Sequence, residues 1–255
     1  MLRKDILKSR PGAGSADPEE IRRFDAMAEE WWKPDGAFRM VHAFNAARVG
    51  YLSRHLPSHF GRDPDTARPL EGMTLLDLGC GAGLVAEPMA RLGAAVTGID
   101  ATERNVAIAA RHAAAEGLAV AYRHALPEVL VAEGQRFDIV LTLEVVEHVA
   151  DLDGFLASTA ALVRPGGVVV VGTLNRTLKS YALAIAGAEY VLGWLPRGTH
   201  DWRKFVTPEE LARALGRGGL VKGETAGVVF DPLRWRWRMA ADTSVNYLAT
   251  FRASV

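Results

Sequence analysis

One cysteine is all that this chain of 255 residues contains. A single thiol excludes an intramolecular disulfide framework and a zinc site built from cysteines, and it fits a reducing compartment. The chain also has no excess of charge, because 30 basic and 30 acidic residues give a net charge of zero. No overall electric field draws the chain toward nucleic acid, so we expect no nucleic-acid partner.

Long apolar runs are missing as well. The longest, residues 178–196, is interrupted by Lys179 and Glu189, so no segment is predicted to span a membrane. Residues 1–15 lack the apolar core that signal peptides have. We therefore expect a cytoplasmic protein with a flexible tail at residues 1–16.

The chain is rich in helix-starting signals near its beginning. The sequence Asp17-Pro18-Glu19-Glu20 combines a capping residue, a proline at the first helical position and an acid at the third, which predicts a helix start. A second helix is predicted at residues 41–56 from its apolar spacing. Residues 17–70 are thus expected to form a helical cap, and the pattern leaves open whether it closes over a ligand or covers a sheet edge.

A glycine-rich loop is the most informative motif. Residues 75–83, LLDLGCGAG, lead from an apolar strand into a turn where main chain can approach a ligand without interference from Cβ atoms. Asp100 ends the next strand with a carboxylate that can accept from both hydroxyls of a ribose. The dinucleotide pattern G-x-G-x-x-G is not met, and the acid Asp77 suits a cationic cofactor such as S-adenosylmethionine. The predicted cofactor-binding glycines are Gly79, Gly81 and Gly83.

Strand and helix patterns alternate from residue 71 onward. The strands are predicted at 73–78, 95–100, 119–124, 137–143, 168–173, 220–230 and 244–251. This order predicts an α/β, Rossmann-like class I methyltransferase fold, with a seven-stranded, mostly parallel sheet, an antiparallel last strand and helices on both faces. The methyltransferase domain is expected at 71–255, with a helical insertion at about 177–205.

Three ionisable side chains, Glu144, Glu147 and His148, follow the predicted strand 137–143, whose end meets the ligand edge of the sheet. In one interpretation His148 is a general base for a phenol, whose pKa of about 10 keeps it neutral. In another, all three hold a divalent cation such as Mg²⁺ that acidifies a catechol. In the third, Glu144 binds a hydroxyl of cofactor or substrate, and Glu147 and His148 cap the following turn.

Longer motifs point to one family. The segments 24–32 (FDAMAEEWW) and 198–205 (GTHDWRKF), with 42–51, 76–81, 144–148, 173–176, 187–190 and 245–247, resemble the ubiquinone biosynthesis O-methyltransferase family. The resemblance covers about residues 20–250. It implies methyl transfer from S-adenosylmethionine to phenolic hydroxyls of polyprenylated catechol and quinol intermediates, including the final methylation of 3-demethylubiquinol.

The resemblance also implies roles for particular residues. Arg48, Gly79, Asp100 and Leu143 would contact the cofactor, with Arg48 as a bidentate clamp on its carboxylate. The eukaryotic branch of the family places a divalent metal at the positions matching Glu144, Glu147 and His148, which favours the metal interpretation. His200 would contact substrate or hold a lid, and we favour the lid.

A polyprenyl substrate resides in a bilayer, so we expect peripheral association with the inner face of an anionic membrane. Apolar side chains at helical spacing within 178–195 predict an interfacial helix, with a core helix as the alternative. The run Arg234-Trp235-Arg236-Trp237-Arg238 alternates at strand period and predicts an edge or penultimate strand with a solvated basic face, with membrane contact as a second interpretation. Other enzymes of ubiquinone synthesis are further expected partners.

Two other functions fit the fold. The first is an O-methyltransferase of a soluble phenolic metabolite, and the second is a non-catalytic component of a quinone-synthesis assembly that binds S-adenosylmethionine. The family-specific motifs outside the glycine loop disfavour the first. The three ionisable residues at the predicted site disfavour the second, because a scaffold has no need for them.

Overall fold

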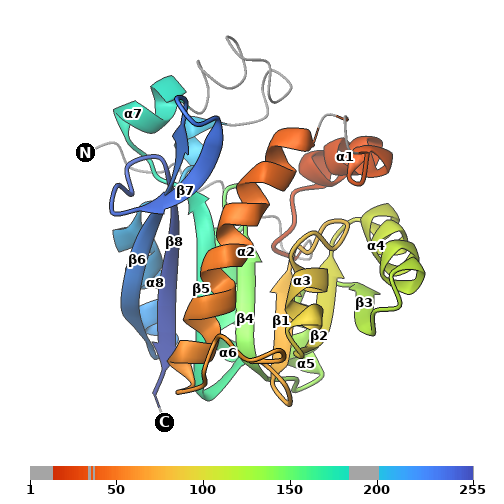
Figure 1. The fold of residues 1–255 in the computed structure, drawn as a ribbon. Coiled ribbons are helices and arrows are strands. Elements are labelled where there is room, and N and C mark those ends of the chain that lie inside the picture. Colours follow the sequence, from red (N-terminus) through yellow and green to blue (C-terminus); the bar gives the residue numbers. More distant parts are fainter. Residues whose placement is uncertain (1–13, 34–35, 37, 184–200, 255) are drawn as a thin grey trace.

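The structure is a computed structural model that describes residues 14–33, 36, 38–183 and 201–254. Its N-terminal part is helical, as the sequence predicts. Helix α1 (Pro18–Met27) begins at the expected capping residue, because the Asp17 side chain accepts a hydrogen bond of 3.0 Å from the backbone N–H of Glu19. A 3₁₀ turn, η1 (Ala28–Glu30), follows, and α2 (Arg39–His59) then lies along the sheet (Figure 1).

One twisted sheet organises the rest of the described chain. Its strands are β1 (Thr74–Leu78), β2 (Ala95–Asp100), β3 (Val120–His124), β4 (Phe137–Leu143), β5 (Val163–Leu174), β6 (Leu220–Asp231), β7 (Arg236–Ala240) and β8 (Asn246–Ala253). Their order is β3-β2-β1-β4-β5-β8-β6-β7. The first five strands are parallel, whereas β8 is antiparallel to both β5 and β6.

The predicted fold class is confirmed, but the predicted count of seven strands is wrong. The described residues form eight, because the basic and aromatic run contributes an edge strand, β7, which pairs antiparallel with β6. The interpretation of this run as an edge strand is confirmed, although Arg234 and Trp235 lie in the turn before the strand.

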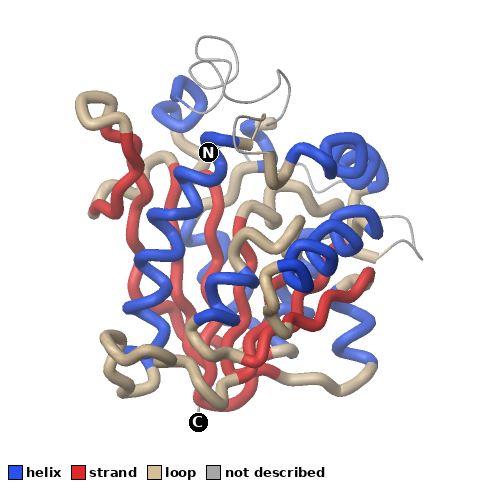
Figure 2. The backbone as a smooth tube through the Cα atoms, turned by 45° about the vertical axis from the view of Figure 1, so that its right-hand side comes forward, coloured by secondary structure: helices blue, strands red, loops and turns tan. Residues whose placement is uncertain are grey.

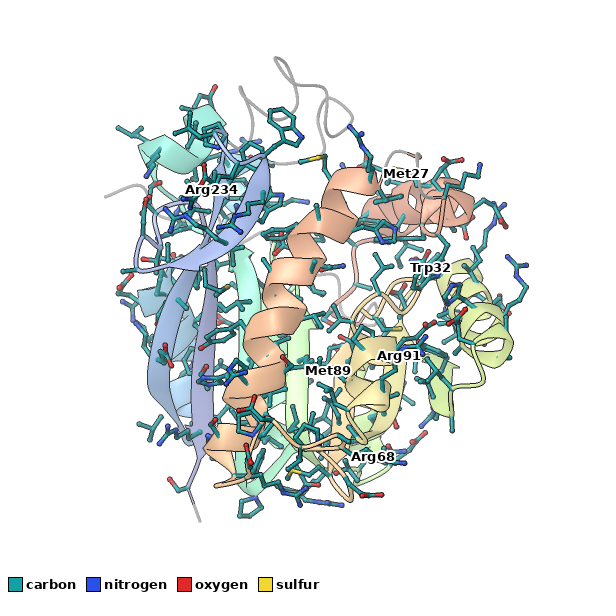
Figure 3. The ribbon with its side chains drawn as sticks, in the orientation of Figure 1. Met27, Trp32, Arg68, Met89, Arg91 and Arg234 are labelled. Carbon is teal, nitrogen blue, oxygen red and sulfur yellow. The ribbon has the colours of Figure 1, made fainter. Side chains whose placement is uncertain are left out.

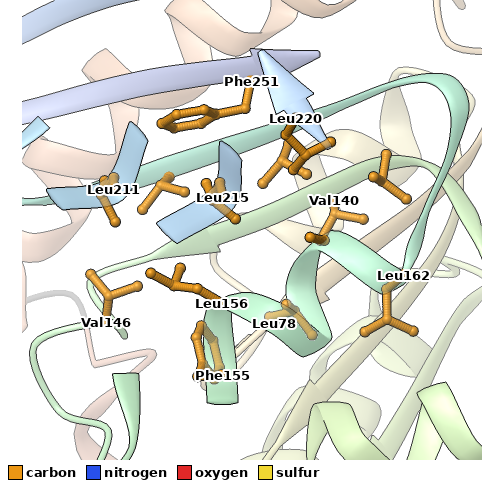
Figure 4. Close-up of a cluster of buried hydrophobic side chains, with 14 of the residues drawn as sticks. Leu78, Val140, Val146, Phe155, Leu156, Leu162, Leu211, Leu215, Leu220 and Phe251 are labelled. Carbon is orange, nitrogen blue, oxygen red and sulfur yellow. The ribbon is translucent and has the colours of Figure 1, made fainter. Parts of the chain in front are cut away.

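Helices cover both faces of the sheet (Figures 1 and 2). Helices α2 and α3 (Ala86–Arg91) pack on one face, and α5 (Pro127–Ala132), α6 (Leu152–Ala161) and α8 (Pro208–Arg217) pack on the other. Helix α4 (Glu103–Ala115) lies against β2 and β3. Figure 4 shows the core on the face that α5, α6 and α8 cover. There Phe155 and Leu156 of α6 meet Leu211 and Leu215 of α8 beside strand residues such as Val140.

Some elements differ from the prediction for local reasons. Helix α5 has six residues, which is too short for an apolar period to reveal it, although Pro127 stands at its first position. Helix α8 begins at a capping box, in which Thr207 and Glu210 bond each other's backbone N–H groups.

The predicted insertion at 177–205 is described only at its two ends. Helix α7 (Leu178–Ser180) opens it and the 3₁₀ turn η3 (Trp202–Lys204) closes it. His200, most of the predicted interfacial helix and residues 1–13 of the predicted tail lie outside the described residues. Among the helices that the structure describes, none has the length and hydropathy needed to cross a membrane.

Candidate functional site

A cavity of about 870 Å³ opens at the carboxyl ends of the parallel strands, a size suited to small-molecule ligands. The cavity therefore lies at the edge of the sheet where the sequence predicts a ligand. The cap, the glycine loop, the ends of β2 and β4, and the β6–β7 hairpin all contribute to its wall. Its lining includes Phe24, Trp31, Arg48, Asp77, Gly79, Gly81, Asp100, Leu143, Glu144, His148 and Trp237.

The glycine loop requires its glycines for backbone shape. Gly79, Gly81 and Gly83 have φ angles of +71°, +53° and +92°, which residues with a side chain rarely adopt. A Cβ at Gly79 would also stand 2.5 Å from a methyl carbon of Val145. The N–H groups of Gly79 and Cys80 both donate to the carbonyl of Ile99, which fixes the loop against β2.

Asp100 is buried and supports this loop directly. One carboxylate oxygen accepts from the N–H of Gly81 at 2.9 Å, and the other accepts from the N–H of Thr102 at 2.8 Å and from the Asn105 amide at 3.3 Å. Burial raises the pKa of Asp100, while these hydrogen bonds oppose the shift. The residue lines the cavity, as expected for a ribose-binding acid, and it also shapes the glycine loop.

A buried cation, Arg48 of α2, lies among acidic side chains. Its guanidinium donates to Glu144 Oε1 at 2.8 Å and to Asn45 Oδ1 at 3.0 Å, and only 3% of Arg48 is exposed. Burial raises the pKa of Asp77 to about 7, although Arg48 pulls it down. Arg48 thus places a cation at the cavity wall, and Asp77 places an acid there. Both residues were predicted to bind the cofactor.

The end of β4 carries backbone strain. Leu143 is buried and lines the cavity, and Glu144 beside it has φ of +57°, one of two such non-glycine angles among the described residues. The Glu144 N–H donates to the carbonyl of Gly172 at 2.8 Å, which holds this conformation. A strained residue at a ligand edge is typical of a functional site.

His148 is held by an acid that sequence reasoning did not place in the site. Its Nδ1 lies 3.1 Å from Glu20 Oε2, and its ring meets Phe24 edge-on with centroids 5.2 Å apart. Glu20 also contacts Arg23 and Lys204. Burial raises the pKa of Glu20, but its hydrogen bond to His148 and the nearby cations lower the pKa overall, so Glu20 is a carboxylate at neutral pH.

Glu147 lies behind the cavity wall. Its Oε2 accepts a hydrogen bond of 2.7 Å from the Thr173 hydroxyl, whereas its buried Oε1 has no hydrogen-bond partner among the described residues. Burial, followed by the charge of Glu144, raises the pKa of Glu147 from 4.5 to about 7. Burial therefore favours the protonated form of Glu147.

The proposed metal ligands have different partners. Glu144 faces Arg48, Glu147 faces Thr173 and His148 faces Glu20. Across the part of the chain that the structure describes, no three acidic, histidine or cysteine side chains are grouped so that they could hold a metal ion. The donor set does not fit a divalent cation in this arrangement.

Replacing Glu147 with glutamine is expected to stabilise the fold above pH 7. Between pH 4.5 and about 7 the folded chain keeps a proton that the unfolded chain releases, so the free energy of unfolding falls as the pH rises through this window. The shift corresponds to at most ~3 kcal/mol. Urea unfolding at pH 4 and pH 8 checks this: the gain should appear at pH 8 and vanish at pH 4, and a loss at pH 8 would contradict it.

Two tryptophans of the cap bind it to the glycine loop and to α4. Trp32, which Figure 3 labels, donates to the carbonyl of Ala82 at 2.9 Å. Its ring stacks on that of His112 of α4, with ring centroids 3.5 Å apart. Trp31 donates to Asn105 Oδ1 at 3.1 Å. Phe24, Met27 and Trp31 of the cap line the cavity, so the cap closes over it. The sequence pattern left open whether the cap would do this or would cover a sheet edge.

The surroundings of Cys80 favour its neutral thiol form. It is buried in the glycine loop, and burial followed by the charges of Asp100 and Asp77 raises the pKa of its thiol.

A family model and curated relatives match this chain over more than half of its length. A family model described as a methyltransferase domain matches residues 52–222. The chain is 53% identical over 242 residues to a ubiquinone biosynthesis O-methyltransferase of Methylobacterium sp. (strain 4-46), covering 95% of this chain and 97% of that protein. It is 52% identical over 242 residues to the protein of the same name in Methylocella silvestris, covering 93% and 94%.

A solved structure supports the fold. Magnesium protoporphyrin IX methyltransferase from Synechocystis PCC 6803, with bound SAH, superposes with a TM-score of 0.64 and 19% identity, covering 91% of this chain and 95% of that one. At this identity the likeness concerns the fold alone.

Proposed function

Because this chain belongs to the ubiquinone biosynthesis O-methyltransferase family, we propose that it methylates a phenolic oxygen of polyprenylated catechol and quinol intermediates, including 3-demethylubiquinol. The observation that carries this proposal is the pairing of His148 with Glu20 at the wall of a cavity that also contains the glycine loop. A base, a cofactor loop and an apolar lining then meet in one space.

The residues fit S-adenosylmethionine. At Gly79 the backbone leaves a space that a Cβ would fill. Asp100 is a buried carboxylate, which can accept hydrogen bonds from the hydroxyls of a ribose. When bound, S-adenosylmethionine supplies an electrophilic methyl group on a positively charged sulfur. The residues that would hold it are Arg48, Asp77, Gly79, Gly81, Gly83, Asp100 and Leu143.

His148 is the proposed general base. An ionised carboxylate only accepts hydrogen bonds, so His148 Nδ1–H donates to Glu20 and Nε2 is the nitrogen that takes a proton. A phenol with a pKa of about 10 is scarcely ionised at neutral pH, so transfer of its proton to Nε2 as the oxygen is methylated lowers the barrier. Glu20 orients the ring and stabilises the imidazolium that forms. Glu144 is proposed to position the substrate hydroxyl.

Replacing His148 with alanine is expected to lower kcat by about 10²–10⁴-fold, the usual contribution of a general base, and to leave cofactor affinity nearly unchanged. Glu20→Gln should lower kcat by less, because the amide still contacts the ring but carries no charge. Single-turnover rates and cofactor titrations separate the two effects. Glu19→Gln, on the neighbouring exposed position of α1, is the matched control. An unchanged rate in His148→Ala would remove His148 from the mechanism.

The substrate is tested by transfer of a labelled methyl group to a short-chain demethylubiquinol and to a simple soluble catechol, each with chelator and with added Mg²⁺. Turnover of the quinol supports the proposal, and turnover that is indifferent to chelator supports His148 as the base. Turnover of the soluble catechol alone would overturn the quinol assignment. Turnover that collapses with chelator would restore the metal interpretation.

We also propose peripheral association with a membrane. A polyprenyl tail partitions into the bilayer, so an enzyme without a spanning helix among its described residues must meet its substrate at the surface. The exposed apolar side chains of Leu178, Tyr181 and Leu183 support this, since they stand at the start of the predicted interfacial segment.

A further inference from the structure

The tip of the β6–β7 hairpin exposes apolar and basic side chains together. Leu233 is 96% exposed and Trp235 is 59% exposed, while Arg234 and Arg236 beside them are also exposed. Figure 3 shows Arg234 on this hairpin, at the same end of the molecule as Met27 of α1, which lines the cavity. Nothing in the proposed chemistry uses these tip residues.

The tip is an ordered turn. The Asp231 carboxylate accepts from the backbone N–H of Leu233 at 3.1 Å and of Arg234 at 3.2 Å. Trp235 has φ of +50°, and its indole packs edge-on against Phe230 with centroids 5.2 Å apart. The turn therefore presents Leu233 outward on a fixed support, in a backbone shape that side-chain-bearing residues rarely adopt.

The hairpin borders the mouth of the cavity. Pro232, Trp235, Trp237 and Arg238 line it from one side, and Lys179 and Leu183 line it from the segment after β5. Lys179 joins the two sides through an ion pair of 2.5 Å with Asp242. Figure 1 shows α7 and β7 at the same end of the molecule. Two sets of exposed apolar side chains thus flank one opening.

The charge at the tip is positive although the chain as a whole is neutral. Arg234, Arg236 and Arg238 lie within five residues. Neither Arg236 nor Arg238 has an acidic partner within 4.0 Å in the described ranges, and Arg234 is 4.0 Å from Asp231. Tryptophan and arginine beside an exposed leucine are the side chains that suit the interface of an anionic bilayer.

We propose that the hairpin tip inserts Leu233 and Trp235 into the surface of an anionic bilayer, with the neighbouring arginines on lipid head groups. This docking surface is defined by residues of the hairpin tip and includes none of the residues 184–200. Only the role of this contact rests on the proposed function. When the tip is bound, the mouth of the cavity faces the lipid that holds a polyprenyl substrate.

Vesicle flotation tests the surface, with vesicles of equal phosphatidylglycerol and phosphatidylcholine and with vesicles of phosphatidylcholine alone. Leu233→Glu is expected to weaken binding to the anionic vesicles by about tenfold. The double variant Arg234→Glu, Arg236→Glu should weaken it by at least about tenfold, with the loss shrinking at high salt. Val221→Glu is the matched control, since Val221 is 62% exposed near the start of β6, the strand whose other end leads into the tip.

Several outcomes overturn the proposal. One is that Leu233→Glu binds the anionic vesicles as strongly as the wild type does. Another is that Val221→Glu loses as much vesicle binding as Leu233→Glu. The third is that the wild type binds equally to both kinds of vesicle. Methyl transfer to the short-chain quinol without vesicles must stay unchanged in Leu233→Glu, and a loss there would also overturn it, since the residue would then act in the site. If the wild type methylates no quinol yet shows the expected pattern of vesicle binding, the proposed function fails and the docking surface stands.

Discussion

Replacing Arg48 with methionine is expected to lower the free energy of unfolding by about 3–5 kcal/mol and to abolish measurable binding of S-adenosylmethionine. The guanidinium is buried and bonds Glu144 and Asn45, so its loss leaves Glu144 without its partner and Asp77 without a compensating cation. The same change removes the group proposed to bind the carboxylate of the cofactor. Urea unfolding and calorimetric titration measure the two effects.

A second substitution separates stability from binding. The double variant Arg48→Met, Glu144→Gln replaces the ion pair by neutral groups, so it should regain much of the lost stability but none of the cofactor affinity. Arg54→Met is the matched control on the same helix, since its pair with Asp65 is exposed on both sides and contributes under about 1 kcal/mol. Recovery of cofactor binding in the double variant would exclude Arg48 as the carboxylate ligand.

The second large effect is expected at Gly79. An alanine there must hold φ near +71° and place its Cβ 2.5 Å from Val145, so the loop or the wall after β4 has to move. We expect a loss of about 2–4 kcal/mol in the free energy of unfolding, which combines backbone strain and overpacking. Cofactor affinity and kcat should both fall, because the displaced wall carries Glu144 and His148. Thermal unfolding, titration and turnover measure these three changes.

Two variants divide this effect into its parts. Gly117→Ala has φ of +68° with no atom within 4 Å of the new Cβ, so it reports the backbone strain alone, about 1–2 kcal/mol. Adding Val145→Ala to Gly79→Ala removes both methyl carbons and leaves the nearest atom at 3.5 Å, so cofactor binding should partly return. If Gly79→Ala is no more destabilised than Gly117→Ala, the close approach of Val145 is not a constraint.

Local signals in the sequence predicted most of the fold. Capping residues such as Asp17 and Thr207 define helix starts within a few residues, and apolar runs define the strands around the glycine loop. Helix α5 was missed because six residues carry no period. The run 234–238 was interpreted as an edge strand but was not counted among the seven. The turn before it, centred on exposed Leu233, lacks the glycine and asparagine that usually indicate a hairpin, and its left-handed residue is Trp235.

The site was only partly predictable, because its key contact joins distant parts of the chain. Glu20 was recognised as a helix-starting acid, but its carboxylate bonds His148, 128 residues away. Spacing along a strand or helix carries no record of such a pair. For the same reason, the sequence predicted that Glu144, Glu147 and His148 lie together at the site, but it did not predict that each would bond a different partner.

The position of β8 in the sheet affects how the chain folds while it is being synthesised. This strand follows all the others in the chain, yet it lies between β5 and β6 and bonds both. The β6–β7 hairpin therefore has no place in the sheet until β8 has left the ribosome, and until then β5 presents an unpaired edge. Within the sheet, β8 alone joins the β6–β7 hairpin to the five parallel strands, so deletion of residues 246–253 should yield aggregated rather than merely less active protein.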